Sequence, residues 1–204
     1  KMKEQAARFG ARLVSRRAGE VDLSRRPFTV KTPDETYETY ALIVATGASA
    51  KWLGVPGEKE LVGHGVSSCA TCDGFFFRDR EVVVVGGGDS AMEEAIFLTK
   101  FASKVTVVHR RDQLRASKIM QERAKSNPKI EFVWNTVVDA INAENGVVSS
   151  VTLRNVQDGS TREFRTDGVF VAIGHSPNTE FLRGQVEMDE QGYIITRGGT
   201  ATSV

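Results

Sequence analysis

The stretch EVVVVGGGDSAMEEAIFLTKFASKVTVVHRR, residues 81–111, contains every part of a nucleotide-binding βαβ unit in order. Glu81–Val85 is a short, mostly β-branched run, long enough for a buried parallel strand and too short for a helix. A glycine-rich turn follows, and residues 90–100 then place apolar side chains at helical spacing. Lys104–Val108 is a second β-branched run. The stretch therefore predicts a strand, a turn, a helix and a second parallel strand, an arrangement that holds dinucleotides.

The turn itself reads GGGDSA at residues 86–91 and fits the pattern G-x-G-x-x-A. In that pattern Gly86 makes the tight turn, Gly88 lets the backbone approach a pyrophosphate, and Ala91 lets the helix lie close to the strand. Asp89 and Ser90 stand between them, at the start of the helix. We expect this turn to bind a dinucleotide; the alternative is an ordinary glycine-rich connection between strand and helix.

The residues after the second strand indicate which dinucleotide is bound. A site for NAD has a carboxylate there, which binds the ribose 2′-hydroxyl. This chain instead has His109, Arg110 and Arg111, with Arg115 one helical turn further on. Guanidinium groups pair with a 2′-phosphate in bidentate fashion. The sequence therefore favours NADP(H) over NAD(H); the alternative is a solvated basic start of a helix.

Bulk properties exclude several classes of partner. The 204 residues can bury one sizeable core or two small ones, and the net charge is only +1 with no basic block. Neither nucleic acid nor a membrane surface is therefore expected as a partner. No apolar run approaches the length of a transmembrane helix. Because the chain opens on Lys1 in what reads as the middle of a helix, we expect it to be part of a longer protein.

The first fifty residues predict a helix followed by an antiparallel meander. Residues 1–9 favour a helix that ends at Gly10. Short alternating runs then predict strands, divided by turns that contain proline; these runs are residues 12–14, 20–23, 28–31 and 37–40. Residues 41–45 predict a buried strand that ends in the turn at Thr46 and Gly47. We expect the chain to cross into a second domain at residues 50–55.

The remainder continues the α/β pattern and then changes to hairpins. Residues 116–126 predict a helix and residues 130–134 a third parallel strand. Three alternating runs, at residues 136–141, 147–155 and 162–166, surround two strong hairpin signals, Asn145-Gly146 and Asp158-Gly159. Residues 167–173 predict another buried strand, broken at 174–178 by a second crossing. The fold class is therefore α/β: a Rossmann-like three-layer domain with an antiparallel meander at 51–175, between outer segments 1–50 and 176–204.

Cys69 and Cys72 form a C-x-x-C pair just before the nucleotide-binding stretch. Two intervening residues let the sulfurs bond reversibly, and one thiol of such a pair commonly has a lowered pKa. Zinc would need two further ligands, and the three histidines of the chain are not paired at ligand spacing. A redox dithiol is favoured, and no metal site is expected. Asp73 adjoins the second thiol and could transfer a proton to or from it; the alternative is a helix or turn cap.

Phe75–Phe77 follow the dithiol and have two interpretations. We expect hydrophobic packing under the dithiol helix, with contact to a partner as the alternative. An NADPH site and a dithiol in one chain also require a connecting group, because NADPH delivers a hydride whereas thiol exchange proceeds by thiolate attack on sulfur. A flavin usually joins the two.

Several motifs together resemble the low-molecular-weight thioredoxin reductases of bacterial and plant type. These motifs are SSCATCDGFFFRDREVVVVGGGDSAMEEA at 67–95, HRRDQLRASK at 109–118 and GVFVAIGHSPNT at 168–179, with KMKEQAARFGARL at 1–13 and ALIVATGASAKWLGVPGE at 41–58. The resemblance implies a flavoprotein with two dinucleotide-binding domains, in which an NADPH domain is inserted into a split FAD domain. It assigns 1–50 and 176–204 to the FAD domain, here without the family's first glycine fingerprint and its closing Gly-Asp motif.

The resemblance also implies roles for individual residues. A hydride would pass from NADPH to FAD, and electrons would then pass to the Cys69–Cys72 disulfide and on to thioredoxin. Cys72 would lie nearest the flavin, Cys69 would attack thioredoxin, and Asp73 would be the acid-base partner. The remaining implied cofactor contacts are Thr46 and Gly47 to FAD, Gly86, Gly88, Asp89, Ser90 and Ala91 to the NADPH pyrophosphate region, His109, Arg110, Arg111 and Arg115 to the 2′-phosphate, and Ile173 and Gly174.

The family further implies a cytoplasmic homodimer in the full-length protein and a rotation of the inner domain about hinges at the two crossings. Two other functions stay open at this stage. One is an NADP(H)-binding chain without turnover. The other is a related flavoprotein that reduces a different disulfide partner.

Overall fold

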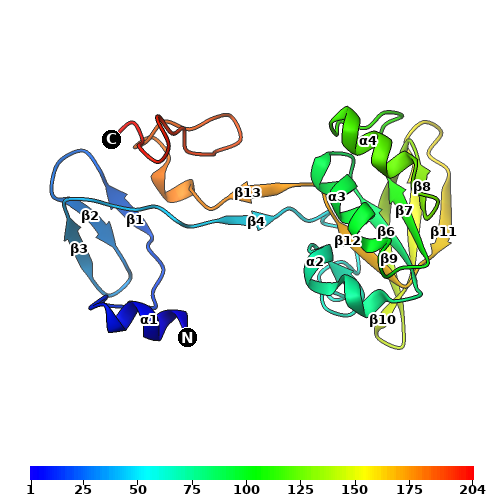
Figure 1. The fold of residues 1–204 in the computed structure, drawn as a ribbon, viewed down its shortest axis with the longest axis horizontal. Coiled ribbons are helices and arrows are strands. Elements are labelled where there is room, and N and C mark those ends of the chain that lie inside the picture. The colour runs from blue at the N-terminus through cyan, green and yellow to red at the C-terminus, as the bar shows by residue number, and fades with distance from the viewer. The chain divides into compact units, whose positions relative to one another are not determined.

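A computed structural model describes residues 1–204, which fold into two compact units (Figure 1). One unit comprises Ala50–His175, and the other combines Lys1–Ser49 with Ser176–Val204. The chain passes between them in β4 (Ala48–Ala50) and β13 (His175–Pro177), which pair as a two-stranded sheet. Residues 174–178, which were predicted to break the preceding strand at a second crossing, thus include a short strand. None of the helices is long and apolar enough to cross a membrane.

A five-stranded parallel sheet forms the centre of the Ala50–His175 unit. Its order is β5-β12-β6-β7-β8. The bounds are Val66–Ser67 for β5, Glu81–Val85 for β6, Lys104–Val108 for β7, Ile130–Val133 for β8 and Gly168–Val171 for β12. The valines of β6 and β7 are buried on both faces, as expected for strands covered on both sides. The predicted βαβ unit and its third parallel strand are confirmed, whereas β5 was not predicted.

Helices cover one face of this sheet and an antiparallel meander lies on the other (Figure 1). The helices are α2 (Ala70–Asp73), α3 (Asp89–Leu98) and α4 (Lys118–Lys125), with the 3-10 turn η1 at Gly74–Phe77. The meander consists of β9 (Thr136–Glu144), β10 (Val147–Asn155) and β11 (Thr161–Arg165). Asn145 and Gly146 take positive φ angles of 53° and 81° in the first hairpin turn, which explains that sequence signal. The predicted three-layer α/β class is confirmed.

The second unit has a small core. It contains α1 (Met2–Arg8), the 3-10 turn η2 (Glu180–Leu182) and an antiparallel sheet of β1 (Glu20–Asp22), β2 (Phe28–Lys31) and β3 (Thr36–Thr39). The buried members of its core are Val21, Leu23, Phe28 and Leu182. The Gln185 side chain accepts from the Leu23 amide at 2.8 Å and donates to the Val21 carbonyl at 2.6 Å, which fixes the later segment to β1.

Two predicted strands of this unit are wrong. Residues 12–14 and residues 41–45 form no strand, and Ile43 is 92% exposed rather than buried. The physical reason is pairing: an extended run becomes a strand only beside a partner that takes up its N–H and C=O groups. No strand of this chain lies beside either run. The apolar character of 41–45 is therefore insufficient to form a buried strand here.

Candidate functional site

A cavity of about 740 Å³ lies where the carboxyl ends of the parallel strands meet. The turn after β6, the residues after β7, the end of β12 and part of β9 line it. It thereby brings together nine of the residues predicted to contact a cofactor, which are Gly86, Gly88, Asp89, Ser90, His109, Arg110, Arg115, Ile173 and Gly174. Ala91 and Arg111 are not among its lining residues, and Thr46 and Gly47 belong to the other unit.

The glycine turn is as tight as its sequence pattern predicts. Gly86 has a φ of +155°, and a Cβ atom at this position would lie 2.4 Å from the Ala172 carbonyl oxygen and 2.7 Å from the Ala91 Cβ. A side chain is thus excluded at Gly86, and Ala91 is buried against the strand. Gly88 differs, because nothing lies within 4 Å of its Cβ direction and the residue faces the cavity. Space is left there for a ligand to approach the backbone.

The start of α3 adds a field that favours an anion. Gly88 is the N-cap of this ten-residue helix, and its carbonyl accepts the Met92 amide at 3.2 Å. The first amides of α3, before Met92, have no hydrogen-bond partner within the helix. These free N–H groups and the positive end of the helix dipole therefore point toward the glycine turn. Such an end binds phosphate groups. Asp89 and Ser90 at this end line the cavity.

The middle glycine has a structural role that the sequence pattern does not specify. A Cβ on Gly87 would lie 2.3 Å from Cε1 of His109, whose ring is buried against the turn. The His109 Nε2 atom is 3.0 Å from the Gln113 carbonyl oxygen. Burial lowers the pKa of His109, and the neighbouring arginines lower it further. The His109 ring thus packs directly against the glycine turn.

Backbone hydrogen bonds place the arginines at the same turn. The Gly87 carbonyl accepts the amides of Arg115 at 2.7 Å and Ala116 at 3.1 Å. Arg110 and Arg115 line the cavity, whereas Arg111 is exposed outside it. None of these three arginines forms a salt bridge with a carboxylate. The cavity therefore has two unneutralised guanidinium groups on the side where the sequence predicts a 2′-phosphate.

Asp89, the carboxylate within the turn, lines the cavity and is also hydrogen-bonded to Ser117. Its Oδ1 accepts both the amide and the hydroxyl of Ser117 at 2.8 Å, just before α4 begins. These two hydrogen bonds, that of the amide first, lower the pKa of Asp89. The residue therefore ties the start of α3 to the start of α4.

Cys69 and Cys72 are joined by a disulfide at the start of α2. Cys69 is the N-cap residue, and its Sγ accepts the Cys72 amide at 3.2 Å. Cys69 is half-buried and Cys72 is exposed. An amide aimed at Sγ stabilises a thiolate at that position once the disulfide opens.

Asp73 is held by a serine that sequence reasoning missed. The buried Ser67 donates its hydroxyl proton to Asp73 Oδ2 at 2.6 Å and accepts the Cys69 amide at 3.0 Å. The Asp73 carboxylate is thus fixed relative to the dithiol through one side chain. It lines a second pocket of about 390 Å³, together with His64, Phe76 and Arg80. Only the short distance in sequence from Ser67 to Cys69 could have indicated this serine.

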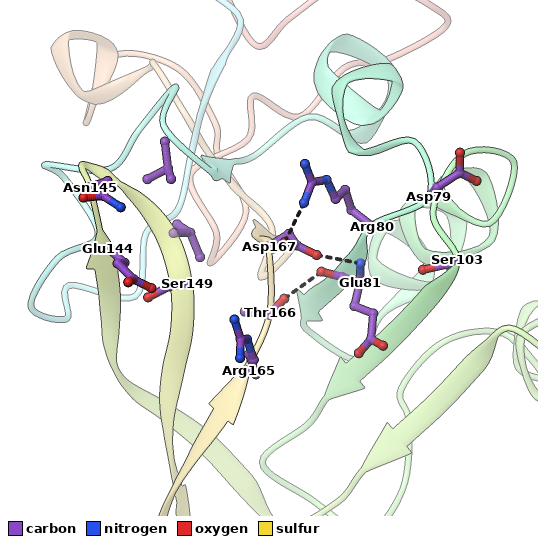
Figure 2. A pocket seen from close by; sticks show the side chains of 12 residues that line it. Asp79, Arg80, Glu81, Ser103, Glu144, Asn145, Ser149, Arg165, Thr166 and Asp167 are labelled. Atoms are coloured by element: carbon purple, nitrogen blue, oxygen red, sulfur yellow. Dashed lines mark hydrogen bonds and ion pairs between the residues drawn. The ribbon is translucent and has the colours of Figure 1, made fainter.

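A third, polar pocket of about 520 Å³ adjoins the second one (Figure 2). The two pockets share Arg80, Val147, Val148 and Asp167. Figure 2 shows Asp167 accepting the Glu81 amide at 3.0 Å and pairing with Arg80 at 3.4 Å, while Thr166 donates to the Glu81 carbonyl at 3.0 Å. These contacts fix the connection between β11 and β12 to the start of β6. The two pockets therefore form one continuous surface from this connection to Asp73.

The phenylalanines after the dithiol are only partly packed. Phe77 lies edge-on to Phe170, with ring centroids 5.1 Å apart. Phe75 is 61% exposed and Phe76 is 76% exposed. The expectation that all three pack under the dithiol helix is therefore wrong for Phe75 and Phe76, which lie in η1 after α2 has ended and stay largely exposed.

Known proteins share this arrangement. The family Pyridine nucleotide-disulphide oxidoreductase matches residues 4–204. The thioredoxin reductase of Mycolicibacterium smegmatis is 54% identical over 199 residues, which are 98% of this chain and 64% of that relative. The thioredoxin reductase of Chlamydia pneumoniae is 50% identical over 208 residues, covering 100% of this chain and 67% of that relative. The chain belongs to the thioredoxin reductase family.

Solved thioredoxin reductases also share the fold. The structure from Giardia duodenalis matches with a TM-score of 0.84 and 43% identity, covering 100% of this chain and 67% of that one. These relatives confirm the predicted thioredoxin reductase resemblance and the fold with two dinucleotide-binding domains. Members of the thioredoxin reductase family contain FAD and depend on NADPH. The chain spans about two thirds of the length of these thioredoxin reductases.

The residues predicted to face FAD lie in the unit of Lys1–Ser49 and Ser176–Val204. Gly47 has a φ of +66°, and its carbonyl accepts the Asn178 amide at 3.0 Å. The Thr46 carbonyl accepts the Asn178 side-chain amide at 3.1 Å. This unit has no parallel strand and no glycine turn following one, so its residues by themselves do not make the dinucleotide cradle that thioredoxin reductases need for FAD. No group of three or more histidine, cysteine, aspartate or glutamate side chains is placed to hold a metal ion.

Proposed function

We propose that this protein is an NADPH-dependent thioredoxin-disulfide reductase. The observation that supports it most is that one compact unit contains both a cavity suited to NADP(H) and the Cys69–Cys72 disulfide. Membership of the thioredoxin reductase family favours thioredoxin over another disulfide partner. The dithiol connects a nucleotide that carries two electrons with a protein that accepts them.

Different cavity residues contact different parts of the nucleotide. Gly86 allows the tight turn, Gly88 leaves room for the pyrophosphate, and the start of α3 at Asp89 and Ser90 offers free amides to it. Arg110 and Arg115 pair with the 2′-phosphate. In this proposal Ala91 and His109 act indirectly by holding the turn, and Arg111 contributes only from outside the cavity. Ile173 and Gly174 line the opposite wall.

The dithiol exchanges its electrons with thioredoxin in two steps. The Cys69 thiolate attacks one sulfur of the thioredoxin disulfide, forming a mixed disulfide and releasing a thioredoxin thiolate. Cys72 then attacks Cys69, which restores the Cys69–Cys72 disulfide and releases the second thiolate. Two electrons pass to thioredoxin, and its two thiolates take up two protons. Asp73, fixed by Ser67, transfers a proton at the Cys72 sulfur.

The chemistry that FAD would supply, when bound by the whole protein, is to accept a hydride and to pass two electrons to a disulfide. We assign Thr46 and Gly47 to one side of its site. Further residues of the whole protein are required to complete that site, since these two residues do not form a cradle. The 204-residue chain by itself therefore has a second candidate function, NADP(H) binding without turnover, which its complete nucleotide cavity favours.

A protein partner would meet an aromatic and basic surface beside the dithiol. Phe75 and Phe76 are exposed, and the Arg78 guanidinium lies 5.4 Å from the Phe75 ring centroid. His64 and Arg80 line the adjoining pocket with Asp73. Exposed aromatic side chains and arginine are typical of the centres of protein interfaces. We propose this surface for thioredoxin.

We also propose that the whole protein is a homodimer in the cytoplasm. A reversible C-x-x-C disulfide suits a compartment in which thiols are kept reduced. Size-exclusion chromatography with light scattering tests the dimer. A monomer of the full-length protein at micromolar concentration would contradict it.

The first experiment is a visible absorbance spectrum of the purified chain, before and after anaerobic addition of NADPH. A flavin band that bleaches would support reductase chemistry in this chain. A spectrum without that band, combined with NADPH binding measured by calorimetry, would instead support the second candidate function. Failure to bind NADPH at all would contradict both.

Trapping then assigns the two sulfurs. A Cys72→Ser variant leaves Cys69 free to attack, so it should accumulate a mixed disulfide with thioredoxin, whereas Cys69→Ser should not. The reversed pattern would show that the exposed Cys72 is the attacking thiol. Mass spectrometry under non-reducing conditions distinguishes these outcomes.

A further inference from the structure

Glu58 is a fully buried acidic residue that the proposed reaction does not use. It is 0% exposed, and it is not among the residues that line the nucleotide cavity. Its Oε1 atom accepts the Leu53 amide and its Oε2 atom accepts the Gly54 amide, each at 2.7 Å. Burying an acidic group is unfavourable unless its oxygens are hydrogen-bonded, and these two backbone amides meet that need. The Glu58 side chain therefore fixes the backbone at residues 53 and 54.

The segment that Glu58 fixes forms a wall of the nucleotide cavity. Trp52, Leu53 and Val55 line that cavity. The segment turns back on itself, because the Glu58 amide also donates to the Val55 carbonyl at 3.2 Å. Residues 51–55 belong to no helix or strand, so no regular ladder of hydrogen bonds holds them. The shape of this wall thus depends on the Glu58 side chain.

The meander holds the same segment from its other end. The Ile141 amide in β9 donates to the Pro56 carbonyl at 3.0 Å. Gly57 has a φ of +82°, and a Cβ atom there would collide with the Ile141 carbonyl oxygen. The chain just before Glu58 is therefore packed tightly against β9. Glu58 extends from this fixed point back to the amides at 53 and 54.

The wall begins at one end of the cavity. The sheet order places β12 on one side of β6, whose end forms the glycine turn, and β7, whose end leads to the arginines, on the other. The Lys51 amide donates at 2.9 Å to the carbonyl of Gly174, which follows β12. Trp52 comes directly after Lys51, so it lies at the β12 end. With the 2′-phosphate on the arginines and the pyrophosphate on the turn, this end is left for the nicotinamide half of the nucleotide.

We propose that Glu58 is a positioning residue for the nicotinamide half of NADPH, because it holds Trp52 and Leu53 where that half of the nucleotide lies. This inference rests on the proposed NADPH binding for its ligand. The adenosine half, with its 2′-phosphate, lies at the other end of the cavity and does not need this wall. Loss of the Glu58 hydrogen bonds therefore weakens binding of the whole nucleotide and spares binding of its adenosine half.

The test compares NADPH with adenosine 2′,5′-bisphosphate, which has the 2′-phosphate but no nicotinamide. Glu58→Gln keeps the size of the side chain, but its NH₂ group is a donor and cannot accept the second backbone amide. Calorimetric titration of the full chain should show NADPH binding weakened about tenfold and adenosine bisphosphate binding unchanged. Glu60→Gln, on the same segment but exposed, is the matched control and should bind both ligands as the unmodified chain does.

Two results for Glu58→Gln would overturn the inference. Equal weakening of both ligands would show that the substitution only loosens the whole unit. An unchanged NADPH affinity would show that the wall does not depend on Glu58 or does not meet the nucleotide. Failure of the proposed function looks different, since the unmodified chain would then bind neither ligand, and the inference would fall with it.

If the Gln variant does not fold, nitrogen-15 NMR of the unmodified chain decides the matter. The Leu53 and Gly54 amides should exchange slowly with solvent without any ligand, because Glu58 accepts both of them, and rapid exchange would refute its role. NADPH should shift these two resonances, whereas adenosine 2′,5′-bisphosphate should leave them in place. Shifts with both ligands, or with neither, would contradict the assignment of the wall to the nicotinamide half.

Discussion

Two apolar runs of similar sequence differ in burial between the two compact units. Val83 and Val84 in β6 are 0% exposed, whereas Ile43, in the comparable run ALIVA at 41–45, is 92% exposed. The valines lie between β12 and β7 in a parallel sheet covered by helices and a meander. Ile43 has no neighbouring strand. The difference teaches that a β-branched run indicates only the capacity to form a buried strand, and that its partners decide whether one forms.

The strongest way to test this contrast is to remove a large core side chain from the parallel-sheet unit. Phe170→Ala in β12 should lower the free energy of unfolding by about 3–5 kcal/mol, because the ring is fully buried and leaves a cavity. Urea unfolding followed by circular dichroism measures the change. A loss no larger than that of Val21→Ala in the smaller core would contradict the difference between the units.

The second prediction separates two glycines of the nucleotide turn. Gly88→Ala should leave the unfolding midpoint unchanged but weaken NADPH binding roughly 100-fold, about 2.7 kcal/mol, because its methyl group would occupy the space reserved for the pyrophosphate. Gly86→Ala should lower the unfolding midpoint and also weaken NADPH binding, since its Cβ would clash with the Ala172 carbonyl oxygen. Calorimetric binding and thermal unfolding of both variants test this. Equal effects of the two variants would argue against the assigned roles.

The third prediction concerns the choice of nucleotide. Arg115→Gln should weaken NADPH binding about tenfold and leave NADH binding unchanged, because only NADPH has the 2′-phosphate. Arg111→Gln, outside the cavity, is the matched control and should have a smaller effect. If Arg111→Gln proved the more damaging change, the assignment of the arginines from the cavity would fail.

The fourth prediction is a pH dependence of stability located in the parallel-sheet unit. Burial raises the Glu94 pKa from 4.5 to about 7, so the folded chain keeps a proton that the unfolded chain releases. The resulting stability is fully present below pH 4.5 and is lost as the pH rises toward 7. Because the group is only partly buried, the difference should be about 1 kcal/mol after allowance for solvent screening. Glu94→Gln should remove this slope in denaturant titrations, and an unchanged slope would refute the assignment.

The smallest expected effect is in the other unit. Ile43→Ser should change the free energy of unfolding of this chain by less than about 0.5 kcal/mol, because the side chain is exposed and contacts no core. A loss above 2 kcal/mol would place Ile43 in a core and so remove the contrast with β6.

Sequence reasoning succeeded where the determinants are local. The strand, glycine turn and helix from Glu81 onward depend on residues close together in the chain, and so do the hairpins marked by Asn145-Gly146 and Asp158-Gly159. The strand at 41–45 was predicted wrongly because burial depends on partners elsewhere in the chain. The insertion of β12 between β5 and β6 likewise depends on contacts between distant segments.

The candidate site shows the same division. The glycine pattern, the arginines and the C-x-x-C pair were visible in sequence because each is a short motif. Gly87 against His109 and Ser67 against Asp73 were not, since each contact joins residues that no motif relates. Residues that orient reactive groups are selected by three-dimensional packing, and periodicity contains no signal for them.

Trp52 gives the nucleotide cavity an optical property. It is one of the two tryptophans of the chain and lies on the cavity wall, 39% exposed. The other, Trp134, is stacked on Phe132 with ring centroids 5.0 Å apart and does not line the cavity. Reduced nicotinamide absorbs at wavelengths where indole emits, so NADPH bound in this cavity, as proposed, would quench Trp52 fluorescence by energy transfer. Cavity occupancy would thereby become readable from the unlabelled protein in real time.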